Sequence, residues 1–134
     1  MAITEDFVSF ETAKLLKEKG FNEYCKSVYH AGSVCSVVSL GYIVEEKQNS
    51  DFGKYDNAIS APTLQMAMKW LRVVHHIDII VLTYYMDYLR PNEVHYYSGK
   101  ILKGSEDVIE TIYAKDTYED VCEEAIKYCL ENLI

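Results

Sequence analysis

The sequence predicts an α+β fold: an antiparallel sheet of about four strands with three helices, in the order α-β-α-β-β-β-α, with the helices mainly on one face. Three observations predict it. First, amphipathic segments with capping residues lie near the N-terminus, in the middle and at the C-terminus of the chain. Second, the central segment changes from helical to strand periodicity at Ile77. Third, the strand-like runs that follow are joined by short turns. A chain of 134 residues with 49% hydrophobic residues suits one domain, residues 1–134.

The first helix begins after Ser9, whose hydroxyl is suited to accept a hydrogen bond from a backbone N–H of the first turn. Gly20 is placed to end this helix in a left-handed conformation. Phe21 then supplies the apolar contact that commonly follows such an ending.

A strand is expected over residues 33–44, because both of its alternating faces are substantially apolar. Residues 45–57 are polar and predict a long loop that carries two aromatic side chains, Phe52 and Tyr55. Loops of this length without an element of their own are often functional.

The central helix is expected to begin at Ser60 as N-cap, with Pro62 in its first turn, where the missing N–H costs nothing. Its apolar residues follow helical spacing and lead directly into a strand from Ile77. Further strands are expected over residues 94–102 and 108–115, which makes an antiparallel meander.

The last helix is capped by Thr117, with Asp120 at the third helical position and more acidic residues in its first turns. Its broad apolar face predicts that it packs against the sheet, while its acidic side faces solvent. This makes it the most strongly indicated helix of the chain.

The composition excludes several classes of protein. A net charge of −8 argues against a nucleic-acid binder, which needs excess Lys and Arg to neutralise phosphates. No apolar run reaches the roughly 20 residues of a membrane span, and the N-terminus does not resemble a signal peptide. A cytoplasmic location is therefore expected. Without C-x-x-C spacing, the four cysteines are expected to be buried free thiols: Cys25, Cys35, Cys122 and Cys129.

The chain lacks the sequence motifs of familiar catalysts. It has no glycine-rich phosphate loop, no H-E-x-x-H and no G-x-S-x-G motif. The adjacent His75 and His76 point in different directions on a helix or a strand, so a metal site is not expected. We therefore expect no enzymatic activity, no catalytic residue, no metal and no cofactor.

Candidate binding residues lie on the central helix. Lys69, Arg72 and His76 are spaced three and four apart near Trp70, so an aromatic plane beside cations is expected to hold a planar anion. The alternative is that Trp70 is a core residue between solvated cations. Tyr85 and Tyr97 belong to a second candidate surface, since 12 tyrosines exceed the usual content; plain sheet structure also favours tyrosine.

The stretch SAPTLQMAMKWLRVVHHIDI, with helical segments upstream and downstream, resembles small uncharacterised proteins encoded by phages and prophages of Bacteroides-type bacteria. Its central part is similar to the pattern A-P-T…K-W-L-R-E-V-H-N-I, with Val73 in place of the acidic residue and His76 in place of the asparagine. The resemblance implies a phage accessory protein that acts in the bacterial cytoplasm. It implies no activity.

These features favour a non-enzymatic protein that sequesters a small anionic molecule, such as a nucleotide-like signal of host defence. The alternative is a protein–protein antagonist that binds a host factor through a tyrosine-rich or acidic surface. Homo-oligomers are also expected to be feasible, because tyrosine-rich strands favour pairing.

Overall fold

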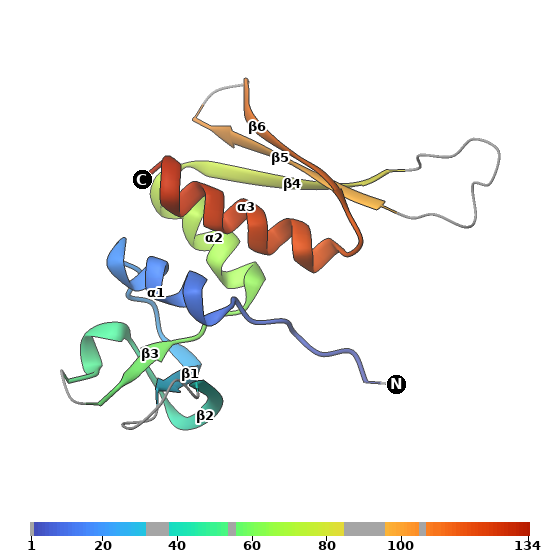
Figure 1. Ribbon diagram of the computed structural model, residues 1–134. Coiled ribbons are helices and arrows are strands. Elements are labelled where there is room, and N and C mark those ends of the chain that lie inside the picture. Colours follow the sequence, from blue (N-terminus) through green and yellow to red (C-terminus); the bar gives the residue numbers. More distant parts are fainter. Residues whose placement is uncertain (1, 32–37, 54–55, 85–95, 105–106) are drawn as a thin grey trace. The chain divides into compact units, whose positions relative to one another are not determined.

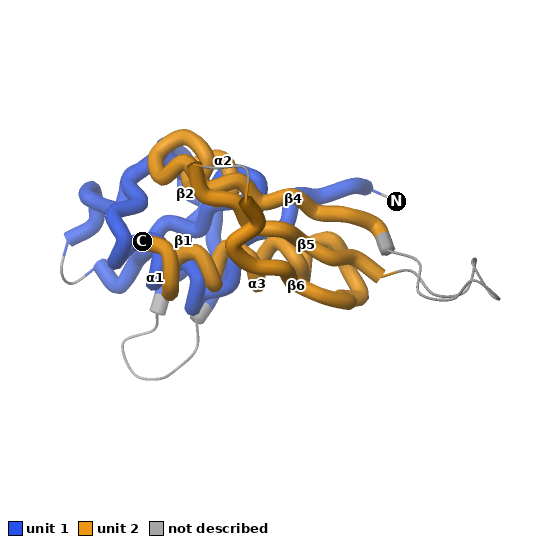
Figure 2. The backbone as a smooth tube through the Cα atoms, turned by 90° about the horizontal axis from the view of Figure 1, so that it is seen from above, with its two compact units in different colours: residues 1–66 blue, residues 67–134 orange. Residues whose placement is uncertain are grey.

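The computed structural model describes residues 2–31, 38–53, 56–84, 96–104 and 107–134 (Figure 1). They form three α-helices and two antiparallel sheets of three strands each, so the α+β class is confirmed. The expectation of one sheet of about four strands is wrong. The chain divides into two compact units, residues 1–66 and 67–134 (Figure 2), and each is described by itself. The expectation of a single domain stays a prediction.

The first helix of unit 1, α1 (Phe10–Glu18), is capped as its sequence predicts. The Ser9 hydroxyl accepts a hydrogen bond from the N–H of Thr12 at 3.2 Å. At the other end Gly20 has a φ of 94°, and the N–H of Phe21 donates to the carbonyl of Leu16 at 2.8 Å. This is a Schellman ending, which buries Phe21 beneath the end of the helix.

The sheet of unit 1 has the order β2-β1-β3, with both neighbours antiparallel to β1. Its strands are β1 (Cys25–Ala31), β2 (Val38–Lys47) and β3 (Ala58–Ser60), and the 3₁₀ turn η1 (Asn49–Asp51) lies between β2 and β3. The strands β1 and β3 were not expected. Moreover, β2 and η1 occupy much of the expected loop 45–57, because this segment pairs and turns through backbone hydrogen bonds.

Helix α2 (Leu64–His75) begins later than the sequence predicts. The N–H of Met66 donates to the Thr63 hydroxyl at 3.1 Å, so Thr63 caps the helix. Ser60 is not the cap, because it belongs to β3 and pairs with Val28 of β1. The helix ends at His75, and strand β4 (Ile77–Tyr84) begins two residues later.

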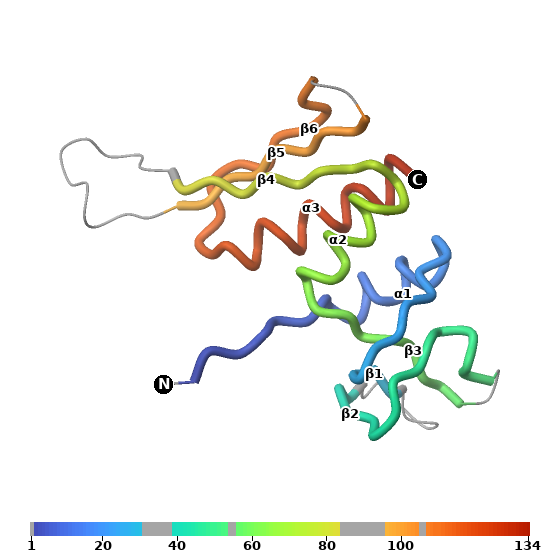
Figure 3. Tube along the Cα trace, turned by 180° about the vertical axis from the view of Figure 1, so that it is seen from behind, coloured from blue at the N-terminus to red at the C-terminus, as the bar shows by residue number. Residues whose placement is uncertain are grey.

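The sheet of unit 2 is the predicted antiparallel meander, in the order β4-β5-β6. Strand β5 (Tyr96–Lys103) pairs with all of β4 without a break in register, whereas its pairing with β6 (Val108–Lys115) shifts twice. Helix α3 (Tyr118–Asn132) contacts all three strands on one face of the sheet, as Figures 1 and 3 show. The hydroxyl of Thr117 accepts from the N–H of Asp120 at 3.0 Å, which confirms the predicted cap.

The core of unit 2 lies between α3 and the sheet. A Cβ at Gly99 of β5 would lie 2.6 Å from Cγ1 of Val121, so glycine is required for the close approach of α3. The other side chains that fill this layer are almost fully buried: Ile77, Ile101, Ile112, Cys122, Ala125, Ile126, Cys129 and Leu130. No helix among the described residues is both long and apolar enough to span a membrane.

Candidate functional site

The predicted binding face of α2 does not combine an aromatic plane with its cations. Trp70 is only 6% exposed, whereas Lys69 and Arg72 are exposed to solvent. The indole packs edge-on against the ring of His75, with 4.7 Å between the centroids. The hydrophobic face of the helix therefore takes Trp70 into the core, as the alternative interpretation predicts, and leaves the two cations on the outer side.

The prediction that Arg72 and His76 share one helix flank is wrong, because His76 lies beyond the end of α2. It has a left-handed φ of 57°, and its carbonyl accepts a hydrogen bond from the N–H of Gly104 at 2.9 Å. This conformation ends the helix and turns the chain into β4. The spacing of four residues therefore does not place these side chains one turn apart.

The two tyrosines of the predicted site lie elsewhere. Tyr97 of β5 is half-buried and packs edge-on against Tyr118, with 6.4 Å between the ring centroids. Tyr85 lies outside the described residues. The role of either residue in binding stays a prediction.

The described cysteines are free, buried and poorly suited to nucleophilic chemistry. Burial raises the pKa of Cys25 to about 11, with further contributions from the carboxylates of Glu23 and Glu46. Burial likewise raises the pKa of Cys122 to about 11 and that of Cys129 to about 12. These thiols are therefore protonated at neutral pH, whereas the nucleophile is the thiolate. Cys35 lies outside the described residues.

Within the part of the chain that the structure describes, no cluster of three His, Cys, Asp or Glu side chains is placed to hold a metal ion.

A cavity of about 380 Å³ in unit 1 combines cations with aromatic rings. We call it the α1–β3 cleft, because its two walls are α1 and the segment that leads into β3. Its lining residues are Phe10, Lys14, Lys17, Phe52, Gly53, Asn57, Ala58 and Ile59.

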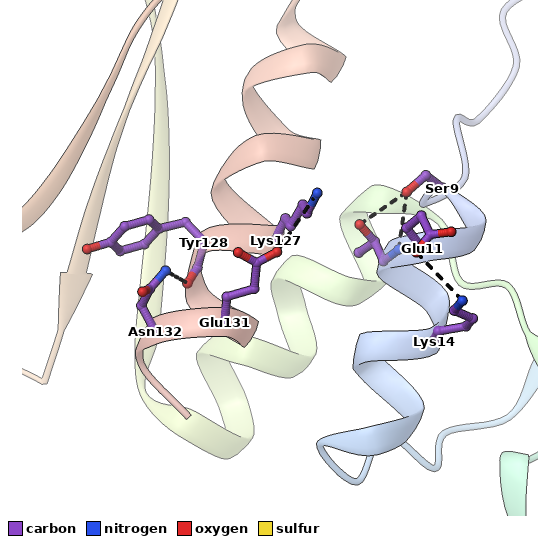
Figure 4. Close-up of polar contacts among 8 residues, drawn as sticks. Ser9, Glu11, Lys14, Lys127, Tyr128, Glu131 and Asn132 are labelled. Carbon is purple, nitrogen blue, oxygen red and sulfur yellow. Dashed lines mark hydrogen bonds and ion pairs between the residues drawn. The ribbon is translucent and has the colours of Figure 1, made fainter.

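The first wall of the cleft is one face of α1. Phe10, Lys14 and Lys17 are spaced four and three residues apart, which places them on the same side of the helix. The ammonium of Lys14 lies 5.0 Å from the centroid of the Phe10 ring, within range of a cation–π interaction. It also lies 3.7 Å from the carboxylate of Glu11 (Figure 4), but both groups are exposed, so this ion pair is weak.

The second wall is fixed by a buried amide at the start of η1. The side chain of Asn49 is almost fully buried; its Nδ2 donates to the carbonyl of Phe21 at 2.9 Å, and its Oδ1 accepts from the N–H of Ser60 at 2.9 Å. One side chain thus joins the end of α1 to β3. This linkage holds the segment with Phe52 in its place beside α1.

Exposed hydrogen bonds extend the same linkage. The side chain of Asn22 accepts from the N–H of Ser50 at 2.8 Å, and the Gln48 side chain donates to the Asn22 carbonyl at 2.8 Å. Farther along, the carboxylate of Asp56 accepts from the N–H of Gly53, which turns this negative charge toward the backbone. The lining of the cleft therefore includes the two cations Lys14 and Lys17 but not the Asp56 carboxylate.

The sequence predicted none of these residues as a site. The sequence gives no binding signal at Lys14 or Lys17 by itself, and it places Phe52 only as an aromatic residue in an expected loop. The usable signal was Phe10-x-x-x-Lys14-x-x-Lys17 on one helix face. The partner wall could not be found in this way, because the contacts of Asn49 join positions 28 and 11 residues apart in the chain.

No protein-family model matches the chain, and no curated protein or solved structure matches it significantly. The resemblance to phage-encoded proteins therefore stays a prediction, and the cleft is interpreted from its own residues.

Proposed function

We propose that this chain is a non-enzymatic binding protein that sequesters a small anionic aromatic molecule in the α1–β3 cleft. One observation carries the proposal: two lysines and two phenylalanines line the same cavity. The cleft supplies the combination of charge and aromatic surface that was expected on α2 but is not found there.

The chemistry of the lining residues favours a nucleotide-like ligand. The ammonium groups of Lys14 and Lys17 are suited to a phosphate, and the rings of Phe10 and Phe52 offer apolar faces to a planar base. A volume of about 380 Å³ lies near the lower end of the roughly 300–1,000 Å³ of typical ligand sites. The ligand is therefore closer in size to a mononucleotide than to an oligonucleotide.

The proposed setting is the cytoplasm of a bacterial host, where the ligand would be a nucleotide-like signal of host defence. This part of the proposal rests on the predicted resemblance of residues 60–79 to phage-encoded proteins. Sequestration requires only binding, which is consistent with the protonated state of the described cysteines.

The test is to incubate the purified protein with a mixture of nucleotides, remove the unbound fraction, release the ligand by heat and identify it by chromatography. An intact nucleotide in the released fraction supports sequestration. A chemically altered nucleotide would overturn the non-enzymatic part of the proposal.

Two charge-matched double variants locate the site. Lys14→Gln with Lys17→Gln should weaken binding roughly a hundredfold or more, because the two lost contacts to a charged group contribute about 1.5–3 kcal/mol each. Lys69→Gln with Arg72→Gln removes the same charge from α2 and should leave the affinity unchanged. The reverse result would place the site on α2.

A second function, antagonism of a host protein, is favoured by exposed tyrosines. Tyr42 of β2 and Tyr113 of β6 are each 75% exposed, and tyrosine is enriched in protein interfaces. If the protein binds no nucleotide, binding to candidate host proteins should then depend on these rings. Replacing Tyr42 or Tyr113 by Ser would test this dependence.

A further inference from the structure

Exposed sheet edges are sites where another strand can add, and most edges formed by the described strands are protected against such pairing. At one edge of the unit 2 sheet, β6 carries Glu110 and Lys115, and its pairing with β5 shifts twice. Ala114 of this strand has a left-handed φ of 46°. Charges and irregular backbone of this kind prevent edge-to-edge pairing.

The edges of the unit 1 sheet are protected in similar ways. Strand β2 ends in Glu45, Glu46 and Lys47, and its register with β1 shifts between Cys25 and Ser27. Strand β3 has only three residues, so it offers little backbone for a further partner.

Strand β4 lacks these protections. Its eight residues, IDIIVLTY, include a single charge at Asp78, and all of them pair with β5 in one unbroken register. Figure 1 shows β4 at the edge of the sheet opposite β6. Ile80 and Leu82 are 44% and 41% exposed, so apolar side chains accompany the unpaired backbone of this edge. Among the described strands, β4 is the most suitable template for strand addition.

We propose that β4 pairs with β4 of a second copy of this chain, in antiparallel orientation about a two-fold axis at Val81. This register places Ile80 opposite Leu82 of the second copy and Ile79 opposite Thr83 of the second copy. A two-fold interface must be self-complementary. The exposed apolar side chains of Ile80 and Leu82 therefore meet across the interface. Asp78 lies far from Asp78 of the second copy, so the two charges do not repel each other.

The paired edges join the two sheets into one continuous sheet of six strands. Eight residues span about 26 Å at the usual rise per residue, so the contact is a narrow strip. Such a strip buries less than the roughly 800 Å² per partner of a standard stable interface. The dimer is therefore weak, and it forms as the protein concentration rises.

Sedimentation equilibrium of the full chain, from micromolar to millimolar concentration, tests this dimer. Leu82→Lys and Ile109→Lys form a matched pair: both side chains are 41% exposed, but they lie on β4 and β6 at opposite edges of the sheet. Wild type and Ile109→Lys should dimerise equally, whereas Leu82→Lys should stay monomeric with an unchanged circular dichroism spectrum.

Amide hydrogen exchange of the wild-type protein gives a readout that needs no variant. Protection of β4 should increase with protein concentration, while that of β6 should not change. A monomer at every concentration would overturn the proposal. Loss of the dimer in Ile109→Lys, or concentration-dependent protection of β6, would also overturn it.

Discussion

The two units each contain an antiparallel sheet of three strands, but different interactions hold the two sheets in place. In unit 1, polar side chains join segments that are distant in sequence, as Asn49 does between Phe21 and Ser60. In unit 2, the apolar face of the amphipathic helix α3 covers one face of the sheet, and Gly99 permits close contact with Val121. Apolar packing thus accounts for more of the architecture in unit 2 than in unit 1.

This difference shows why the candidate site lies in unit 1. Hydrogen bonds hold a wall of irregular backbone beside α1, which leaves an open cleft with exposed cations. Trp70, the aromatic residue that the sequence predicted for binding on α2, is instead buried. A segment held by specific polar contacts can expose aromatic rings that a hydrophobic core would bury.

The largest expected effect is on the core of unit 2. Leu130 of α3 is fully buried, so Leu130→Ala should lower the free energy of unfolding by about 2–5 kcal/mol through lost burial and the cavity left behind. Urea denaturation followed by Trp70 fluorescence would measure this loss. Leu133→Ala, at a half-buried position, should cost clearly less. Equal losses would contradict the assignment of the core.

The next largest effect is on the polar linkage of unit 1. Asn49→Ala leaves the Phe21 carbonyl and the Ser60 N–H without their partner, which should cost about 2–4 kcal/mol. Amide exchange should show faster opening around Phe21 and Ser60. The control is Asn132→Ala, since this exposed side chain donates only to the carbonyl of Tyr128 (Figure 4). If Asn49→Ala left exchange in unit 1 unchanged, the linkage would not be structural.

A smaller effect is expected from pH. Burial, with Lys103 and His76 nearby, lowers the pKa of His75 below its usual 6.5. The unfolded chain therefore binds this proton more readily than the folded chain does. The stabilising contribution of neutral His75 should be complete above pH 6.5, fall as the pH drops toward the lowered pKa, and then level off.

Urea denaturation at a series of pH values would measure this dependence. His75→Gln should reduce the slope below pH 6.5. A slope that persists in His75→Gln would assign the dependence to other groups.

The smallest effect is expected at the junction between α2 and β4. His76 has a left-handed φ of 57°, which asparagine adopts more readily than histidine does. His76→Asn should therefore raise the free energy of unfolding by about 0.5 kcal/mol. Thermal unfolding would detect this gain, and His76→Val should show the opposite change. A loss of stability in His76→Asn would contradict the conformational explanation.

Local signals predicted much of the fold. The caps at Ser9 and Thr117 and the ending at Gly20 depend on residues within one turn of each other, and all three are confirmed. Strand β6 matches its predicted limits, residues 108–115, because its boundaries coincide with turn residues.

Signals between distant residues could not be predicted. Strand β1 contains Lys26, Ser27 and His30, which interrupt an apolar alternation, so its pairing with β2 and β3 had no local sign. Ser60 has the chemistry of an N-cap, but pairing with β1 takes it into a sheet. The candidate cleft depends on the contacts of Asn49 with distant residues. These contacts could not be predicted, because the sequence does not distinguish a buried asparagine in a polar segment from an exposed loop residue.

The most direct test of the proposed site is to map binding of a nucleoside monophosphate by NMR chemical-shift perturbation of the backbone amides. We expect saturable changes confined to residues 10–17, 52–53 and 57–59, where the two walls of the α1–β3 cleft lie. Lys14→Gln with Lys17→Gln should remove these changes. Saturable changes centred on residues 69–76 of the α2 region, with none around the cleft, would contradict the proposal.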